Sequence, residues 1–214
     1  EFEYSSRVSD SFSTTHYKYF MNDENLFSCL DYVIGNMSEP MFSQDSSAFN
    51  ILAKNVSENQ KVVLSGQGAD EVFGGYFWYE QINNDDTQSD IDVFAKYYFD
   101  RNHDNYSQAF NSDFISDNFT YHHIKNIFKS MDSDLALLDK VFRLELSMLI
   151  IDDPVKRIDN MTMAHSLETR VPFLDIDLVS YLLSIKGEMK IQNESKYYLK
   201  KISESYLDQD IIYR

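Results

Sequence analysis

Glycine is scarce in this chain and is concentrated in one place. Six glycines occur in 214 residues, and four of them, Gly66, Gly68, Gly74 and Gly75, fall within ten residues. Glycine loses more backbone entropy on folding than any other residue, so it tends to occur where φ must be positive or where a ligand must approach the backbone closely. The segment from residue 66 to residue 75 therefore predicts a tight turn or a binding loop.

A short run of β-branched residues precedes these glycines. Residues 62–64 (VVL) follow a segment with helical apolar spacing at 46–58 and lead directly into Ser-Gly-Gln-Gly at 65–68. A short continuous apolar run in this position is typical of a buried strand in a parallel sheet. We therefore predict a buried parallel strand at 62–64, a loop at 65–68, and a helix at 69–73 that the following glycines end.

Helical spacing of apolar residues dominates the rest of the chain. The run at 135–151 (LALLDKVFRLELSMLII) is apolar nearly all round, which indicates a helix buried on most faces, and we expect Asp152, Asp153 and Pro154 to end it. Residues 16–20 alternate and are aromatic, so they are a further strand candidate. The prediction is a helix-dominated α/β protein, with two or three short parallel strands in its first third and a mainly helical C-terminal half.

Charge and composition exclude several classes of protein. The chain has 19 basic and 35 acidic residues, a formal net charge of −16, and residues 1–120 hold 20 of the acids but only 6 of the bases. Nucleic acids and anionic membranes both need clustered Lys and Arg, so neither is an expected partner. No apolar run approaches the roughly 20 residues of a membrane-spanning helix, and the first residues do not form a signal peptide. Cys29 is the single cysteine, which excludes an internal disulfide framework. We expect a soluble cytoplasmic protein.

The predicted strand, loop and helix together have the arrangement of a nucleotide site. The carboxyl end of a parallel strand carries its loop to the sheet edge where α/β proteins bind ligands, and free amides at a helix start favour phosphate. Asp70 and Glu71 would lie so close to a phosphate that Mg²⁺ would have to intervene. Neither a Walker A loop nor a complete dinucleotide fingerprint is present. The alternative is a structural turn in which Asp70 only complements the helix N-terminus.

A second cluster of charged residues follows the buried helix, at 152–175 (DDPVKRIDNMTMAHSLETRVPFLD). Mixed charges beside an apolar element form either a functional site or a network of structural ion pairs, and structural pairing is the commoner explanation. We expect His165 to be a satisfied, partly buried histidine, and Glu168 and Arg170 to orient a loop. Met161 and Met163 are predicted to fill the core.

Taken together, two segments resemble the synthetase domain of the glutamine-dependent asparagine synthetase family. VVLSGQGADEVFGGY (62–76) and RIDNMTMAHSLETRVPFLD (157–175) occur in the family's order, about 80 residues apart, and the resemblance covers essentially the whole chain. It implies an adenine-nucleotide α-hydrolase-like domain that uses ATP and Mg²⁺ to adenylate a carboxylate, usually the side chain of aspartate. Ammonia, released from glutamine by a separate N-terminal glutaminase domain, then displaces AMP.

The resemblance also implies roles for individual residues. It assigns ATP binding to Ser65, Gly66 and Gly68, and Mg²⁺–pyrophosphate binding to Asp70.

Position 67 faces the reacting acyl-adenylate in the family and is therefore a catalytic candidate. It is Gln67 here, where an asparagine-forming bacterial enzyme has Glu. A carboxylate at this position could deprotonate an incoming amine, and an amide cannot. Asp153, or its neighbour Asp152, is the candidate to supply that carboxylate instead.

We divide the chain at the linker-like stretch 83–90 (NNDDTQSD). Residues 1–82 form the remainder of a nucleotide-binding α/β unit with the SGQGADE loop, and residues 83–214 form the helical part of the synthetase domain. The family's Ser-Gly-Gly-x-Asp-Ser pyrophosphate loop and its glutaminase domain are absent and are expected before residue 1. A lysine near the reacting phosphate is expected after Arg214. We therefore expect an amide-forming ligase as the full-length protein, and no activity from this fragment alone.

Other functions stay open at this point. A relative could amidate a dipeptide, or close a β-lactam or a lasso-peptide ring, with the same adenylation chemistry. A non-catalytic helical module that keeps the fold is a third hypothesis, although retention of Ser65, Gly66, Gly68 and Asp70 argues against it. The expected partners are small-molecule substrates and the glutaminase domain, and a homodimer is one assembly that the family allows.

Overall fold

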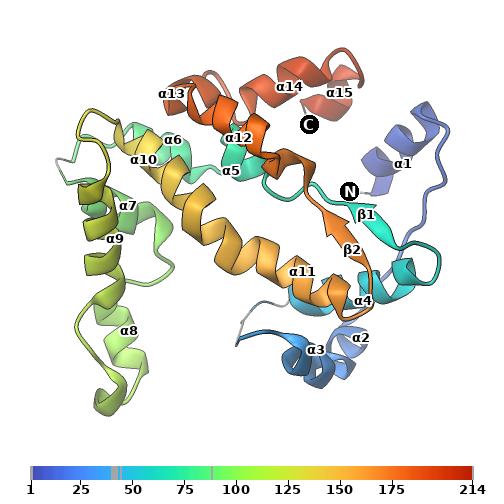
Figure 1. The fold of residues 1–214 in the computed structure, drawn as a ribbon, viewed down its shortest axis with the longest axis horizontal. Coiled ribbons are helices and arrows are strands. Elements are labelled where there is room, and N and C mark those ends of the chain that lie inside the picture. Colours follow the sequence, from blue (N-terminus) through green and yellow to red (C-terminus); the bar gives the residue numbers. More distant parts are fainter. Residues whose placement is uncertain (1, 40–42, 44, 88, 214) are drawn as a thin grey trace. The chain divides into compact units, whose positions relative to one another are not determined.

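The computed structural model describes residues 2–39, 43, 45–87 and 89–213. Helices dominate this part of the chain, and two short strands in it, β1 (Val62–Leu64) and β2 (Glu168–Arg170), form a parallel pair (Figure 1). The predicted class, a helix-dominated α/β protein, is confirmed. The prediction of two or three strands in the first third is wrong, because β2 lies late in the chain and residues 16–20 form no strand. No helix of the described residues is long and apolar enough to cross a bilayer.

The chain packs into two compact units, and both are discontinuous in sequence. Unit 1 comprises Glu1–Gly68, Leu149–Asp175 and Tyr198–Arg214, and unit 2 comprises Ala69–Met148 and Ile176–Tyr197. The glycine-rich segment is therefore shared, with its loop in unit 1 and its helix in unit 2. This division reflects packing alone, so the boundary between residues 82 and 83 stays a prediction.

Unit 1 is built around a helix that packs beside the strand pair. α11 (Lys156–Met163) contacts α4 (Asp45–Ser57) and β2, and β2 pairs with β1. Ala53, Ile158, Met161 and Leu167 are buried here. The remaining helices described in this unit are α1 (Phe2–Ser11), α2 (Asp23–Ser28), α3 (Leu30–Asn36), the short η4 (Pro172–Leu174), most of α14 (Tyr197–Ser203) and α15 (Gln209–Ile212).

The strand pair is formed as predicted, but it is not buried. Val62 is paired with Glu168, and Leu64 with Arg170. Leu64 is nevertheless 75% exposed, and Val62 is exposed as well. A parallel strand is buried on both faces only when other elements cover both faces, and apolar composition alone cannot supply that cover. The buried strand on which the predicted nucleotide site depended is therefore absent, and a nucleotide site here now depends on the loop and on the family resemblance alone.

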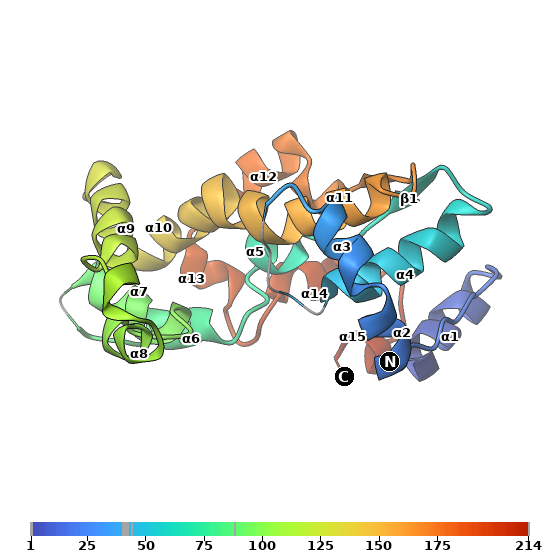
Figure 2. The ribbon, with the colours of Figure 1, turned by 90° about the horizontal axis from the view of Figure 1, so that it is seen from below.

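Unit 2 is a helical assembly around α10 (Leu137–Leu144), which contacts α6 (Trp78–Asn83), α12 (Ile176–Leu183) and α13 (Gly187–Lys190). α7 (Asp90–Tyr98) lies beside α6 and α9 (Phe119–Ser130), and the two figures agree on its place next to α9 (Figures 1 and 2). α5 (Ala69–Phe73), α8 (His103–Ala109) and the short η1 (Ser112–Phe114) complete the described elements. Val72, Tyr79, Phe94, Val141 and Phe142 form the centre of its core.

The helical backbone continues through the Asp-Asp-Pro sequence that was expected to end it. After α10, two π-helical segments, η2 (Glu145–Leu149) and η3 (Ile151–Val155), lead into α11. Proline lacks an N–H, and in an α-helix its ring clashes with the carbonyl four residues earlier. The wider i→i+5 turn of a π-helix relieves this clash. Pro154 therefore changes the type of helix instead of ending it.

Candidate functional site

The loop after β1 is anchored to β2 at its first residue. The Ser65 N–H donates to the Arg170 carbonyl over 2.8 Å, which extends the strand pairing by one step. The Gln67 N–H donates to Ser65 Oγ over 3.3 Å, which folds the loop back on itself. Of the two residues expected to orient a loop, Arg170 contacts this loop through its backbone carbonyl, and such a role for Glu168 stays a prediction. The Arg170 side chain is paired with Glu168 at 2.8 Å.

Gly66 and Gly68, the two glycines of this loop, are glycine for different physical reasons. Gly68 has φ of +88°, and a Cβ there would stand 2.4 Å from Leu174 Cδ2, so both conformation and space require glycine. Gly66 is exposed, its φ lies outside the left-handed region, and a Cβ there would meet nothing within 4 Å. The fold therefore does not explain Gly66, whereas close approach of a ligand would. A Cβ at Gly35 in α3 would also meet nothing within 4 Å. Free space beside a glycine therefore indicates a ligand only together with the motif around Gly66.

We expect Gly68→Ala and Gly66→Ala to separate folding from binding. Gly68→Ala should lower the free energy of unfolding by about 1–2 kcal/mol from its left-handed backbone alone, before the contact with Leu174 is counted. Gly66→Ala should leave the unfolding temperature of the intact protein unchanged, because its Cβ has room. Equal destabilisation by the two variants, in paired urea unfolding curves, would contradict this account of the loop.

Asp70 lies on α5, and its charge is held by a residue far along the chain. Asp70 Oδ1 lies 2.8 Å from Lys196 Nζ, and the two side chains are 35% and 30% exposed. Gly75 makes room for the pair, because a Cβ there would stand 1.9 Å from Asp70 Oδ1 and 2.3 Å from Lys196 Cε. The Lys196 N–H donates to the Gly74 carbonyl over 3.1 Å. The expected end of α5 at these glycines is confirmed, since Gly74 has φ of +75°.

The described residues test whether Asp70 suits a magnesium ion. They contain no group of three His, Cys, Asp or Glu side chains that could form a resident metal site. Mg²⁺ that arrives with a nucleotide needs only one or two protein carboxylates, because phosphate oxygens and waters supply its other ligands. Asp70 fits binding of Mg²⁺ that arrives with a nucleotide, since its carboxylate is partly exposed and already paired with the Lys196 ammonium.

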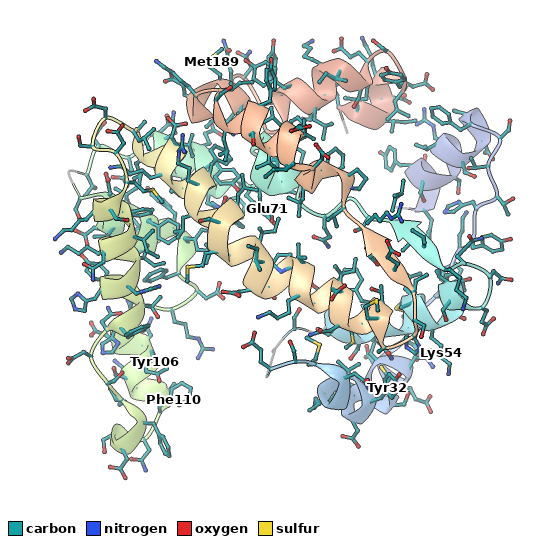
Figure 3. All side chains as sticks on the ribbon, in the orientation of Figure 1. Tyr32, Lys54, Glu71, Tyr106, Phe110 and Met189 are labelled. Carbon is teal, nitrogen blue, oxygen red and sulfur yellow. The ribbon has the colours of Figure 1, made fainter. Side chains whose placement is uncertain are left out.

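Glu71 does not share the surroundings of Asp70, contrary to expectation. Its side chain is buried in unit 2 and accepts a hydrogen bond from the Tyr76 hydroxyl over 2.7 Å (Figure 3). Burial and the nearby Glu71 carboxylate raise the pKa of the Tyr76 phenol, so the tyrosine keeps its proton as a donor. Glu71 is therefore part of the core of unit 2 rather than a phosphate-side carboxylate.

The second charged cluster forms a network of ion pairs within unit 1. Lys156 binds Glu39 and lies 3.4 Å from Asp152, and the Glu39 carboxylate raises the pKa of the lysine. Arg157 lies 3.6 Å from both Asp45 and Asp153. The expectation of structural pairing is confirmed for these residues.

Asp153, the candidate catalytic carboxylate, is exposed and has Arg157 as its recorded partner. Within the described residues no recorded hydrogen bond or ion pair links it to the loop at 65–68, so its catalytic role stays a prediction. The Arg157 Nε is buried and has no hydrogen-bond partner among these residues. The 3.6 Å separations from Asp45 and Asp153 are too long for hydrogen bonds, so the guanidinium is only loosely held.

His165 is a satisfied histidine, as predicted. Its Nε2 lies 2.8 Å from Asn50 Oδ1, and its ring stacks on Tyr32 with 5.6 Å between the centroids. Burial lowers the pKa of the ring, which favours the neutral form. One ring face and one ring nitrogen of His165 therefore have structural partners.

The parallel strand pair and the helices of the described residues define a helix-dominated α/β protein, in which a glycine-rich loop joins β1 to α5. The chain belongs to the asparagine synthase family, whose model matches residues 1–214. This confirms the resemblance that the two segments indicated.

Curated relatives agree with the family assignment. The chain is 29% identical to asparagine synthetase [glutamine-hydrolyzing] 3 of Bacillus subtilis, over 97% of the chain and 34% of that protein. It is 26% identical to a probable asparagine synthetase [glutamine-hydrolyzing] of Schizosaccharomyces pombe, over 97% of the chain and 31% of that protein. It is 23% identical to the human asparagine synthetase [glutamine-hydrolyzing], over 97% of the chain and 29% of that protein. The chain therefore spans about a third of the length of these relatives.

Proposed function

We propose that this chain is part of the ATP-using synthetase domain of a glutamine-dependent asparagine synthetase. The proposed reaction adenylates the side-chain carboxylate of aspartate and replaces AMP with ammonia derived from glutamine, which a glutaminase domain outside this chain would supply. The observation that carries the proposal is Gly66, an exposed glycine that neither φ nor packing requires, in a loop fixed to a strand pair. Membership of the family and the names of its relatives support the chemistry.

The proposed binding roles rest on the family, and the loop in unit 1 and α5 in unit 2 each support their own part of them. Bound ATP supplies the phosphorus that activates the carboxylate and releases pyrophosphate, and Mg²⁺ neutralises the phosphate charge. Gly66 lets the adenylate approach the loop backbone, and the Ser65 hydroxyl keeps a proton to donate. α5 is only five residues long, so its dipole adds little, and the Asp70 carboxylate is the group that attracts a cation. Lys196 holds that carboxylate in place when no metal is bound.

The amide-forming step needs a proton acceptor. Ammonia loses a proton after it attacks the acyl carbon, and the amide of Gln67 cannot take that proton. Gln67 is half-buried at the middle of the loop, where its side-chain N–H₂ can donate to an acyl or phosphate oxygen. Asp153 is the proposed acceptor because it is exposed and only loosely held by Arg157. The role at position 67 rests on the family, the role of Asp153 rests on the need for a carboxylate, and neither is fixed by contacts.

The test is to measure, with the intact protein, which product ATP cleavage gives and which carboxylic acid stimulates it. We expect aspartate to stimulate exchange between ATP and labelled pyrophosphate, and ammonia to convert the aspartate to asparagine with one AMP formed for each amide. Glutamate and an acidic dipeptide serve as alternative acids. ADP as the product, or no stimulation by any carboxylate, would overturn the proposed function.

Gln67 stands where an asparagine-forming enzyme has Glu, which leaves one alternative within the same chemistry open. If an amine of the substrate itself attacks the adenylate, the product is a ring, and no ammonia is consumed. AMP formation that continues at full rate without ammonia or glutamine would favour this ring-closing activity over amidation.

A further inference from the structure

Unit 2 contains a basic helix in strongly acidic surroundings. The unit has 18 acidic and 9 basic residues, yet α9 (FTYHHIKNIFKS) has no carboxylate and carries Lys125 and Lys129. These lysines lie one helical turn apart, where like charges repel each other and destabilise a helix slightly. An arrangement of this kind is unfavourable unless something negative lies near both side chains.

A pocket of about 360 Å³ opens beside this helix. Lys125 and Lys129 line it from α9, Lys140 from α10, and Asp90 from the start of α7. Three of the nine basic residues of unit 2 therefore face one pocket, and Asp90 is the single carboxylate among its recorded lining residues. Phe128 forms an apolar part of the wall and Ser133 adds a hydroxyl. α7 and α9 lie side by side here (Figures 1 and 2).

The two carboxylates of α7 in and near the pocket, Asp90 and Asp92, are already engaged. Asp90 Oδ2 lies 2.7 Å from Lys140 Nζ, and the Lys140 side chain is only 11% exposed, so this pair is a fixed part of the wall. Asp92, the neighbouring acid on α7, accepts a hydrogen bond from the Tyr121 hydroxyl over 2.6 Å. Lys125 Nζ lies 5.5 Å from the centroid of the Tyr121 ring. The charge of Lys129 has no recorded partner within the described residues.

We propose that this pocket binds a small dianion, either a phosphate monoester group or a dicarboxylate. Asp90 offsets Lys140, so the lining residues keep a net charge of +2 from Lys125 and Lys129, of which Lys125 also acts on the Asp92 carboxylate. A lysine ammonium is a compact charge that binds phosphate and carboxylate oxygens without the fixed geometry of arginine. The volume lies at the low end of small-molecule sites, so the ligand carries little more than its charged groups and a short apolar part against Phe128. None of its recorded lining residues belongs to the Ser65–Asp70 segment, and the proposal does not depend on the proposed function.

Chemical labelling of lysines can test the pocket locally. The intact protein is acylated at limiting reagent in inorganic phosphate, in malonate, or in chloride at matched ionic strength, and each lysine is quantified by peptide mass spectrometry. We expect phosphate, malonate or both to slow the labelling of Lys125 and Lys129 at least threefold relative to chloride. Lys54 and Lys186, which are exposed and outside the pocket, should be unaffected.

A charge-matched pair of variants provides the second measurement. Lys125→Gln/Lys129→Gln should abolish the calorimetric binding of the protecting anion, while Lys54→Gln/Lys186→Gln removes the same charge and should retain it. Protection by phosphate alone identifies a phosphate ligand, and protection by malonate alone identifies a dicarboxylate. Equal protection of all four lysines, no protection beyond chloride, or unchanged binding in the pocket variant would overturn the proposal.

Discussion

Asp70→Asn should remove most of the carboxylate-dependent ATP cleavage of the intact protein while its unfolding temperature stays close to that of the wild type. Asparagine keeps the size of the side chain and one acceptor oxygen, so packing around Gly75 survives, but the charge that would hold a magnesium ion is lost. Loss of one preorganised electrostatic group of this kind costs about 100- to 1,000-fold in rate. The ion pair with Lys196 is partly exposed, so its loss should change the free energy of unfolding by at most about 1 kcal/mol.

The competing explanation predicts the opposite pair of results. If Asp70 only complements the start of α5, the variant loses a few tenths of a kcal/mol of stability and keeps its activity. Asp86→Asn is a matched control, because Asp86 is exposed in the same unit and the change in charge is identical. Melting curves and magnesium-dependent pyrophosphate release should be measured on both variants. Near-normal turnover of Asp70→Asn at ordinary magnesium concentrations would exclude the metal-ligand role.

The sequence predicts the loop and its flanking elements well because they depend on near neighbours. A β-branched run favours a strand, and glycines with positive φ at 68 and 74 mark a tight turn and a helix end. Burial is a different property. Val62 and Leu64 have the composition of a buried strand, but their exposure depends on what lies over the strand faces, and that is set by distant segments.

Helix phase explains two further differences. Met161 is fully buried, as predicted, but Met163 is more than half exposed, so its prediction as a core residue is wrong. Residues two positions apart on a helix point about 200° apart, so both could not face one core. Pro154 was expected to end the preceding helix because the rule for proline assumes α-helical geometry. The backbone around Pro154 is π-helical instead, so that rule does not apply there.

Long-range pairing is the part of the candidate site that local patterns could not reveal. Lys196 lies 126 positions after Asp70, so no local pattern connects the two residues. The role of Gly75 follows from this pair, since its missing Cβ leaves room for both side chains. Glu71 was missed as a core residue because an acid beside Asp70 gives no sign of burial, and its partner Tyr76 becomes apparent only in the folded chain.

The largest effect of pH on stability should come from Glu145, which is buried at the start of the first π-helical segment. Its side chain is only 1% exposed, Oε2 accepts a hydrogen bond from the Tyr79 hydroxyl, and Oε1 has no hydrogen-bond partner among the described residues. Burial raises the pKa of this carboxyl to about 8, although the Tyr79 hydrogen bond works in the opposite direction. Near pH 7, Glu145 is therefore mostly protonated in the folded protein and ionised in the unfolded chain.

The direction of the pH effect follows from proton binding. Between about pH 4.5 and pH 8 the unfolded chain releases a proton that folded Glu145 retains, so stability falls as pH rises, by up to about 1.4 kcal/mol per pH unit. Lys190 is also buried, and burial lowers its pKa to about 8. It is charged in both states below pH 8, so its opposite effect, a gain in stability with rising pH, begins only above that value.

Glu145→Gln should remove this slope. The amide has the shape of the protonated acid and can still accept from Tyr79, so we expect equal stability near pH 5 and a variant more stable by roughly 3 kcal/mol near pH 7.5. The unfolding free energy of both proteins should be measured by urea titration at several pH values between 5 and 8. Every other titrating group, including His165, is common to both proteins, so their difference isolates Glu145. Difference infrared spectra at pH 7 provide a direct check, because the wild type should show the band of a protonated carboxyl that the variant lacks. Parallel stability curves together with an ionised carboxylate at pH 7 would mean that the core of unit 2 tolerates a buried charge, and Lys190 would then be its counter-ion.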